Sequence, residues 1–403
     1  MMISVEEARR RILDGFAPLP AEQVSLANAL GRVLVHDIAS RRTQPPSAVS
    51  AMDGYAVRAG DVADAPVALQ IIGQAPAGGA YGGIVGAGEC VRIFTGGPVP
   101  RGADAIVIQE DTDADGDRVT VKAAVPEGHY IRPAGLDFSA GEICLKAGRI
   151  LSARDIGLAA AMNVPWLMVH RRPRVAILAT GDEVVMPGDP LGPNQIVSSN
   201  GLSLGAFVQA RGGTPVQLGI APDNRDALAA MAAGARGADL LVTTGGVSVG
   251  EHDLVHSVLS EAGLELDFWR IAMRPGKPLL FGRIGDTPVL GLPGNPVSSL
   301  ICAIVFMVPA LDRMQGVATA ARPRHTVRLA VPLRQNDERE DYLRATLSYD
   351  GEPRVTPFSR QDSSMVSRLA QADCLIVRAP HAPPADAGET VEILPLPEGM
   401  ARI

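Results

Sequence analysis

Residues 243–253, TTGGVSVGEHD, combine a glycine-rich turn with a cluster of acidic residues. The turn follows the apolar run DLLV, so it predicts a strand that enters a turn and then a helix. Backbone N–H groups in such turns bind phosphates and other oxyanions. A Walker-type loop would end in Gly-Lys-Ser or Gly-Lys-Thr, whereas this turn ends in Glu251, His252 and Asp253. The sequence therefore predicts an anion site with acids beside it.

Two more glycine-rich polar turns follow apolar runs: TGDEV at 180–184 and GLPGNP at 291–296. In an alternating strand–helix fold the carboxyl ends of parallel strands meet at one edge of the sheet, so we expect the three turns to converge on a ligand. Tight turns also need glycine without any ligand, and Ser248 with Glu251 fits a capping box. The residues predicted to bind substrate here are Thr180, Gly181, Asp182, Thr244, Gly245, Gly246, Ser248, Pro293 and Asn295.

The acids Asp182, Glu183 and Asp253 have two interpretations. They could begin helices, where a carboxylate is stabilised by about 0.3–1 kcal/mol against the helix dipole. They could instead hold a divalent cation, Mg²⁺, that bridges them to phosphates. We favour the metal interpretation because the acids gather around a predicted anion site.

Arg274 and Lys277 lie in the stiff turn RPGKP at 274–278. They are interpreted either as solvated turn charges or as a clamp for an oxyanion. The segment HDLVH at 252–256 places two histidines at i,i+4, as in some zinc enzymes, but no third ligand follows. A dihistidine zinc site is therefore not predicted.

Composition excludes several classes of protein. A net charge of −7 and 4% aromatic residues argue against a nucleic-acid partner. The N-terminal segment has acids where a signal peptide would be apolar, which favours a cytoplasmic protein. The scattered cysteines, typical of reduced thiols in that compartment, are Cys90, Cys144, Cys302 and Cys374.

The uncharged stretch 291–311 is nearly long enough to span a bilayer. Its first six residues are typical of a turn, and Pro309 is expected to interrupt its end. Asn295 and Pro296 are typical of a helix start, so the stretch predicts a buried helix and no membrane partner.

At 403 residues the chain is too long for one core, so several domains are expected. The predicted fold class is α/β plus β. Residues 1–46 with 141–172 are expected to form an elongated helical linker domain, and 47–140 an inserted β domain. Residues 173–322 are expected to form an α/β domain with an open, mostly parallel sheet, and 323–403 a barrel-like β domain.

Seven motifs occur along the chain in this order: AMDGYAV, FTGGPVPRGADAIV, RPAGLDF, ATGDEV, TTGGVSVGEHD, RPGKP and GLPGNPVSS. In this order and spacing they resemble the motifs of the molybdopterin molybdenumtransferases, the MoeA-type family of molybdenum cofactor synthesis that includes the E domain of gephyrin. The resemblance covers essentially the whole chain.

The resemblance implies Mg²⁺-dependent insertion of molybdate into adenylylated molybdopterin, with release of AMP. It implies a homodimer in which the β domain of one subunit faces the α/β domain of the other. Enzymes that supply the adenylylated pterin or receive the finished cofactor are implied as partners. By motif, the resemblance assigns catalytic roles to Asp53, Thr95, Asp137, Glu183 and Asp253, and metal binding to Asp182, Glu183 and Asp253.

Two positions depart from the family pattern. Arg274 stands where the family commonly has lysine, and a planar fork replaces a point charge. Asp362 stands where glycine is expected, which leaves Arg344 and Ser364 as weaker candidates for binding molybdate. Two other functions stay open at this stage: a molybdopterin adenylyltransferase, and a non-catalytic pterin-binding or scaffold dimer.

Overall fold

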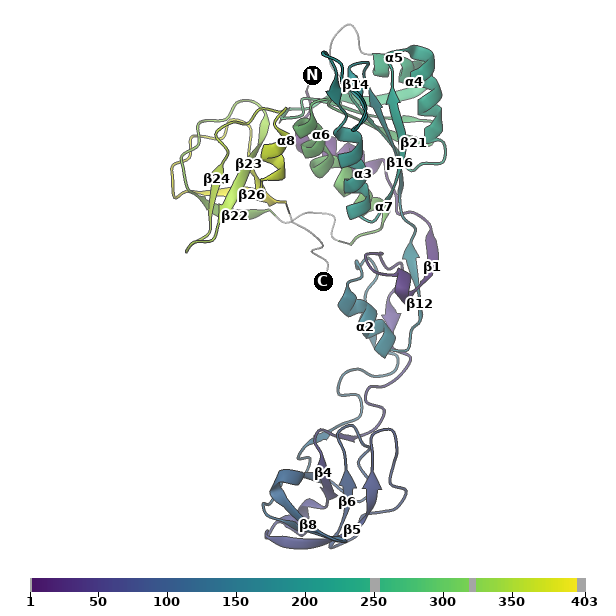
Figure 1. Ribbon diagram of the computed structural model, residues 1–403, viewed down its shortest axis with the longest axis vertical. Helices are drawn as coiled ribbons and strands as arrows, with labels where there is room; N and C mark the ends of the chain where they lie inside the picture. The colour runs from purple at the N-terminus through teal and green to yellow at the C-terminus, as the bar shows by residue number, and fades with distance from the viewer. Residues whose placement is uncertain (1, 247–253, 319–323, 397–403) are drawn as a thin grey trace. The chain divides into compact units, whose positions relative to one another are not determined.

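The structure is a computed structural model that describes residues 2–246, 254–318 and 324–396. The chain forms two compact units (Figure 1). Unit 1 comprises Met1–His36, Ala147–Arg154 and Leu167–Ile403, and unit 2 comprises Asp37–Lys146 and Asp155–Trp166.

A six-stranded mixed sheet is the centre of unit 1. Its order is β16-β13-β17-β21-β20-β18; the first four strands are parallel and the last two pairings are antiparallel. The predicted open, mostly parallel sheet is confirmed. The strands are β13 (Arg174–Thr180), β16 (Thr214–Ala221), β17 (Leu240–Thr244), β18 (Leu264–Arg270), β20 (Pro278–Ile284) and β21 (Thr287–Leu292).

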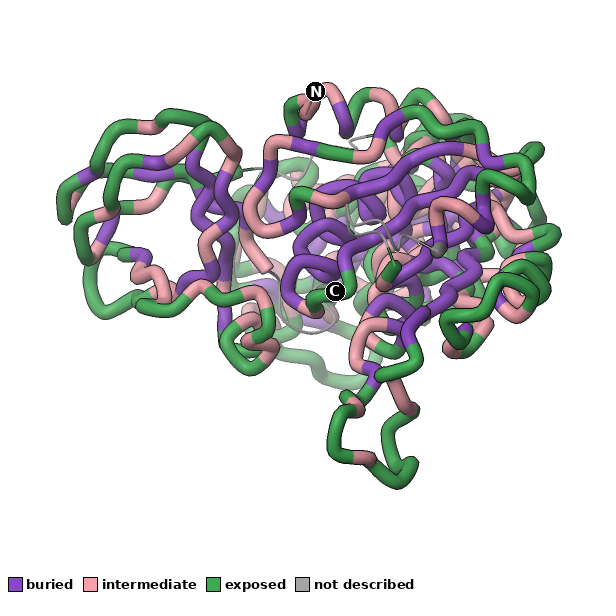
Figure 2. The backbone as a smooth tube through the Cα atoms, turned by 90° about the horizontal axis from the view of Figure 1, so that it is seen from above, coloured by how far each residue is buried: buried purple, intermediate pink, exposed green. Residues whose placement is uncertain are grey.

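Helices cover both faces of this sheet because its strands are apolar on both sides. Helices α3 (Asn200–Ala210) and α6 (Pro296–Cys302) share one core with side chains such as Ile177 and Val242. Helices α4 (Arg225–Ala232) and α5 (Leu254–Glu261) cover the opposite face, against side chains such as Leu178. Figure 2 shows the buried backbone concentrated in these central strands.

Residues 296–314 form one continuous buried helix. It runs through α6, a π-helical turn (Ala303–Met307) and α7 (Val308–Met314). By length and composition this helix could cross a membrane, yet 94% of its most apolar stretch is buried inside the structure. The predicted buried helix is confirmed, but the expected break at Pro309 is wrong. The wider π turn precedes Pro309, which lacks an N–H to donate, and the helix continues beyond it.

Helix α1 (Val5–Asp14) packs onto the same core, with Val5, Ala8 and Ile12 buried. Strand β1 (Ala21–Ser25) pairs with β12 (Trp166–His170), with a 3₁₀ turn (Leu26–Asn28) after β1. The predicted helical linker range therefore contributes α1 to the α/β core, while the four-domain division as a whole stays a prediction.

A closed five-stranded barrel forms the C-terminal part of unit 1, as predicted. Its strands pair in the circle β23-β24-β22-β26-β25 and back to β23. Their bounds are β22 (His325–Leu329), β23 (Glu340–Ser348), β24 (Arg354–Pro357), β25 (Cys374–Arg378) and β26 (Thr390–Pro395), with α8 (Val366–Ala370) between β24 and β25.

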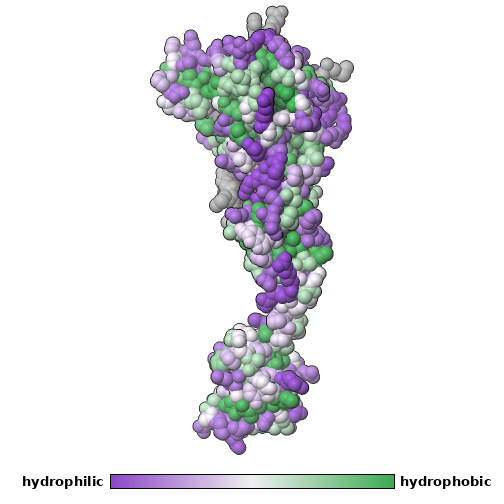
Figure 3. All heavy atoms as spheres, turned by 90° about the vertical axis from the view of Figure 1, so that its right-hand side faces the viewer, coloured by the Kyte–Doolittle hydropathy of each residue, from purple (hydrophilic) through white to green (hydrophobic). Residues whose placement is uncertain are grey.

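Unit 2 contains the predicted β domain. Its six-stranded sheet has the order β7-β4-β6-β5-β9-β8, and its core includes Tyr55, Val57 and Leu69. Figure 3 shows that both hydrophobic and hydrophilic side chains lie on this face of the chain. The strands are β4 (Gly54–Val57), β5 (Val67–Ala75), β6 (Glu89–Ile93), β7 (Ala105–Ile108), β8 (Thr112–Asp115) and β9 (Arg118–Val121).

Shorter elements complete both units. In unit 2, β2 (Ile38–Ala39) pairs with β11 (Ile143–Leu145), and β3 (Val49–Ser50) pairs with β10 (Ile131–Arg132). In unit 1, β14 (Val184–Val185) pairs in parallel with β15 (Ile196–Val197). Helix α2 is Ala153–Ala161, and the remaining 3₁₀ turns are Ala59–Val62, Gln109–Asp111 and Ala233–Ala235.

An ion cluster joins the α/β part of unit 1 to the barrel. Strand β19 (Met273–Arg274) pairs with β23, and Arg274 Nε donates to Asp341 Oδ1 at 2.6 Å. The same guanidinium donates to Asp337 Oδ2 at 2.6 Å and to Asn336 Oδ1 at 3.0 Å. Asp341 is only 5% exposed, and Arg274 is its cationic partner. Arg274 therefore has a structural role.

Replacement of Arg274 by alanine should destabilise the chain, because it leaves the buried Asp341 carboxylate without its cation. We expect a loss of roughly 2–3 kcal/mol in the free energy of unfolding. The urea midpoint, followed by circular dichroism, measures this loss. As a control, Arg328→Ala removes an ion pair whose partners are both about half exposed, at 48% and 57%, and should cost under about 1 kcal/mol. Equal midpoints for the two variants would contradict the assignment.

Candidate functional site

Three turns meet at one edge of the central sheet, as predicted. The parallel register pairs Ala179 with Thr244 and Thr244 with Leu292, so β13, β17 and β21 end at the same level. The turns line a cavity of about 670 Å³. Its lining also includes residues 196–200 and Ser364 from the C-terminal region.

Most of the predicted binding residues line this cavity. They are Thr180, Gly181, Glu183, Thr244, Gly245, Gly246, Pro293, Asn295 and Ser364. Ser248 and Asp253, together with Glu251 and His252, lie outside the described residues.

Glycine is required in the turn after β17 for steric reasons. Gly245 and Gly246 both have positive φ, at 92° and 61°. A Cβ atom at Gly245 would lie 2.7 Å from the carbonyl oxygen of Thr180, and one at Gly246 would lie 2.3 Å from Val255 Cγ2. The turn can therefore pack against the end of β13 only with glycine at these positions.

Asn200, at the first residue of α3, holds two of the turns together. Its side-chain amide donates to Thr244 Oγ1 and to the carbonyl oxygen of Gly294, both at 2.8 Å. Sequence reasoning missed this residue. The available signal was the polar run SSN at 198–200 directly before a helical pattern.

Some buried oxygen atoms at this edge have no hydrogen-bond partner among the described residues. They include Thr180 Oγ1 and Asn200 Oδ1, both of which belong to residues that line the cavity. An unsatisfied buried polar atom costs about 1–3 kcal/mol, so such atoms are uncommon without a function. The arrangement is typical of a polar ligand site.

The acids at the cavity do not begin helices. Asp182 and Glu183 lie in the turn before strand β14, so the helix-dipole interpretation is wrong for both. Asp182 Oδ1 accepts a hydrogen bond from the backbone N–H of Asp223 at 2.9 Å. Glu183 and Asp223 line the cavity. Helix α4, which follows Asp223, is capped by Asn224, whose side chain accepts from the N–H of Ala227.

The oxygen donors at this cavity are of the kind that Mg²⁺ binds. No group of three or more His, Cys, Asp or Glu side chains suited to a metal occurs among the residues that the structure describes. Mg²⁺ usually binds one or two carboxylates and completes its shell with water and substrate phosphates. Glu183 and Thr180, which both line the cavity, carry a carboxylate and a hydroxyl, and both are hard oxygen donors.

The predicted basic residues are not among the described residues that line the cavity. Arg274 is bound by the barrel, and the carboxylate of Asp341 raises its pKa. Lys277 is exposed, and the next residue, Pro278, lines the cavity.

Arg344, a candidate for binding molybdate, is 1% exposed, and burial lowers its pKa. Its Nη1 donates to the carbonyl oxygen of Met365 at 3.1 Å. Asp362, the departure from family glycine, accepts from the hydroxyl of Ser364 at 2.6 Å, and this bond lowers the pKa of Asp362. Asp362, which stands where glycine was expected, therefore holds the Ser364 hydroxyl in a local turn.

The predicted residues of unit 2 divide into a bonded pair and a cavity residue. Asp53 Oδ1 accepts from both the backbone N–H and the hydroxyl of Thr95, each at 2.7 Å. These two bonds hold the pKa of Asp53 below its ordinary value. Asp137 lines a separate cavity of about 580 Å³ that lies wholly within unit 2.

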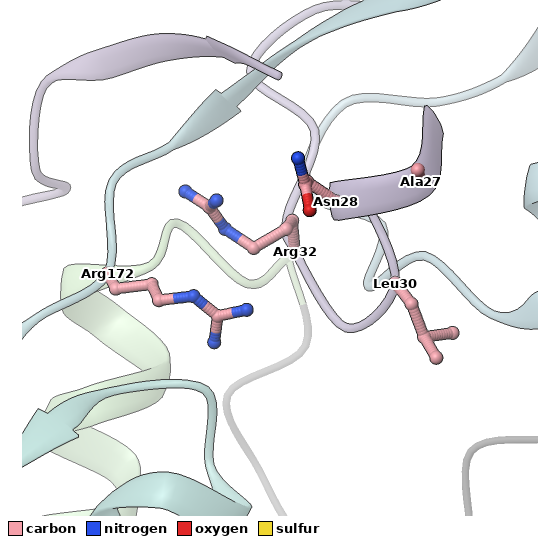
Figure 4. Close-up of a pocket in the computed structure, with 5 residues that line it drawn as sticks. All are labelled: Ala27, Asn28, Leu30, Arg32 and Arg172. Carbon is pink, nitrogen blue, oxygen red and sulfur yellow. The ribbon is translucent and has the colours of Figure 1, made fainter. Parts of the chain in front are cut away.

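A third cavity, of about 360 Å³, lies beside the 3₁₀ turn Leu26–Asn28 (Figure 4). Arg32 and Arg172 line it, but Arg32 is 6% exposed and donates to Glu22 and to the carbonyl oxygen of His170. Arg172 donates to the carbonyl oxygen of Gly212 at 3.0 Å. These bonds indicate a structural role.

Comparison with known proteins connects this geometry to one family. A family model described as the MoeA N-terminal region (domains I and II) matches residues 3–163. A probable molybdopterin binding domain matches 176–313, the range that holds the three turns, and the MoeA C-terminal region (domain IV) matches 326–396.

Similar proteins cover nearly the whole chain. The molybdopterin molybdenumtransferase of a Nostoc species is 35% identical over 98% of this chain and 94% of the relative. That of Haemophilus influenzae is 32% identical over 98% of both chains. A solved structure of a molybdopterin biosynthesis MoeA protein from a Pyrococcus species has a TM-score of 0.84 and 31% identity, and covers 98% of this chain and 99% of its own. The chain therefore belongs to the MoeA family of molybdopterin molybdenumtransferases.

Proposed function

We propose that this chain catalyses the Mg²⁺-dependent insertion of molybdate into adenylylated molybdopterin, with release of AMP. The observation that supports this most strongly is the cavity at the ends of β13, β17 and β21, which is lined by the glycine turn, by threonine residues and by Glu183. A phosphoanhydride needs hydrogen-bond donors and a carboxylate, because its negative charge must be neutralised while a nucleophile is directed at phosphorus.

The roles of the residues follow from this arrangement. Glu183, with Asp182 and Asp253, would hold Mg²⁺, which supplies neutralisation of charge on the phosphoanhydride. The backbone of Gly245 and Gly246 and the hydroxyls of Thr180 and Thr244 would bind phosphate oxygens. Asn200 keeps the turns after β17 and β21 in register through its two hydrogen bonds. Glu183 would also orient the water that attacks the anhydride and accept its proton.

Replacement of Glu183 by glutamine preserves the side-chain volume but removes the negative charge that would hold Mg²⁺ and accept the proton of the attacking water. We expect turnover to fall on the order of 100-fold, and the Mg²⁺ concentration for half-maximal activity to rise roughly 10–100-fold. AMP release from adenylylated molybdopterin measures both quantities. Asp189 lies in the exposed segment 186–191 that follows β14, outside the cavity lining. Asp189→Asn is therefore the matched control and should behave like the parent. A Glu183→Gln variant that is folded and fully active would refute the assignment.

The Asp53–Thr95 pair should act without a change of charge near neutral pH. Both hydrogen bonds stabilise the carboxylate, so the folded pKa is depressed and the contact is lost only as the pH falls through that lowered value. Thr95→Val keeps the backbone donor, which is the larger cause of the shift. We therefore expect Thr95→Val to reduce kcat roughly 10-fold with the same pH–rate profile between about pH 6 and 9. The lost hydroxyl bond raises the pKa of Asp53, but an acid limb that moves into the window between about pH 6 and 9 would contradict this account.

We further propose a homodimer in which the Asp53–Thr95 group of one subunit completes the α/β cavity of its partner. Exposed hydrophobic side chains support an interface near each site. At the cavity they include Ile196 (58% exposed) and Val197 (47%), and in unit 2 they include Leu136 (58%). Such exposed apolar side chains mark association surfaces when they gather in one region.

Complementation between inactive variants tests the dimer. Asp53→Asn and Glu183→Gln subunits, co-expressed at equal levels, should form mixed dimers with one intact site each. Because half of the random dimers are mixed, about a quarter of parental activity should return. Light scattering confirms the dimer mass. Activity no higher than that of the separate variants would overturn the shared site.

The thiol chemistry supports a proposed cytoplasmic location. All four cysteines are free, and three of them are buried. Burial raises the pKa of Cys90 to about 12 and that of Cys374 to about 12, so both stay protonated and unreactive.

A further inference from the structure

The cavity in unit 2 that contains Asp137 presents an uneven set of charges. Strands β3 and β10, the Pro45–Pro46 segment and glycine turns at Gly78–Gly79 and Gly96 form its walls. Its charged lining residues are Arg42, Arg132 and Asp137. Two exposed cations and one exposed carboxylate therefore line this cavity, in a chain whose net charge is −7.

Backbone hydrogen bonds fix the segments that carry these groups. Arg132 pairs with Val49 in the register of β10 and β3. The backbone N–H of Asp137 donates to the carbonyl oxygen of Gln44 at 3.0 Å, and that of Gly135 donates to the carbonyl oxygen of Pro45 at 3.0 Å. The charged residues therefore start from defined backbone positions, which lowers the entropy cost of binding a ligand.

Neither arginine is neutralised within the described residues. Arg42 Nη2 donates to the neutral amide oxygen of Gln44 at 2.7 Å, so it is oriented but keeps its charge uncompensated. Arg132 and Asp137 form no ion pair in the part of the chain that the structure describes, although they line the same cavity. By contrast, Lys122 of the same unit pairs with Asp113 at 2.6 Å.

We propose that this cavity binds the phosphate ester of an organic ligand. Arg42 and Arg132 would donate to phosphate oxygens, since guanidinium groups bind phosphate as planar forks. Asp137 would accept a hydrogen bond from a hydroxyl or N–H group next to the phosphate. A bare, fully ionised oxyanion has no such donor and would be repelled by the carboxylate. Gly96, which lines the cavity, directly follows Thr95, so one wall of the cavity adjoins the Asp53–Thr95 pair.

The inference rests on the proposed function only for the choice of ester. AMP, the expected product of that reaction, carries both a phosphate and ribose hydroxyls. Amide hydrogen–deuterium exchange of the full-length protein gives a reading local to unit 2. AMP should slow exchange in peptides from 40–50 and 128–139. In Arg132→Gln, about tenfold more AMP should be needed for the same protection.

Two controls make the result decisive. Arg118→Gln, at the exposed first residue of β9 and outside the cavity lining, removes the same charge and should match the parent. Arg42→Gln repeats the test at the second guanidinium, and the urea midpoint establishes that each variant is folded. Absent protection by AMP at millimolar concentration, or equal protection in Arg132→Gln and Arg118→Gln, would overturn the proposal. Equal protection by molybdate or inorganic phosphate would overturn the ester assignment.

The outcome is separable from that of the proposed function. Turnover without AMP protection in unit 2 would refute this binding site and leave the transferase reaction intact. Protection without turnover would support the phosphate site and refute the proposed reaction.

Discussion

The parallel pairing of β13, β17 and β21 is the constraint on which the candidate site depends. Because these strands run in the same direction and in register, their turns emerge together at one edge of the sheet. The strands are apolar on both faces, so helices must cover both sides, while this edge stays polar and open. The position of the cavity is therefore a consequence of how the core is buried.

Acids lie beside the anion site because two opposing requirements meet there. Glycine-turn N–H groups and threonine hydroxyls suit an oxyanion, whereas Glu183 would repel it unless a cation intervenes. A site of this composition suits a phosphoanhydride with Mg²⁺ better than a simple phosphate. The family match places a probable molybdopterin binding domain over the range that holds all three turns.

Sequence patterns predicted local structure well. The strand–turn–helix alternation gave the central sheet, and Asn295 before Pro296 correctly marked the start of the buried helix. The glycine turns converged as expected because strand direction follows from βα alternation. The alternative interpretation of Asp182 and Glu183 as helix starts was wrong, since β14 pairs with β15, about a dozen residues farther along the chain. Periodicity in so short a segment cannot reveal that pairing.

Long-range contacts account for most of what sequence reasoning could not supply. Arg274 seemed suited to an oxyanion, but its guanidinium binds Asp337 and Asp341 in the barrel, more than sixty residues away. Asn200 is an ordinary helix-start residue by pattern, and only the fold brings it to Thr244 and Gly294. Such partners are set by tertiary packing and not by neighbouring residues.

The most direct test of the central claim is a single-turnover experiment. The purified protein is mixed with adenylylated molybdopterin and Mg²⁺, with and without molybdate, and AMP release is followed over time. Our account predicts AMP release that depends on molybdate and is lost in Glu183→Gln. Tight binding of the adenylylated pterin without AMP release, in the presence of molybdate, would contradict it and indicate a pterin-binding or scaffold protein.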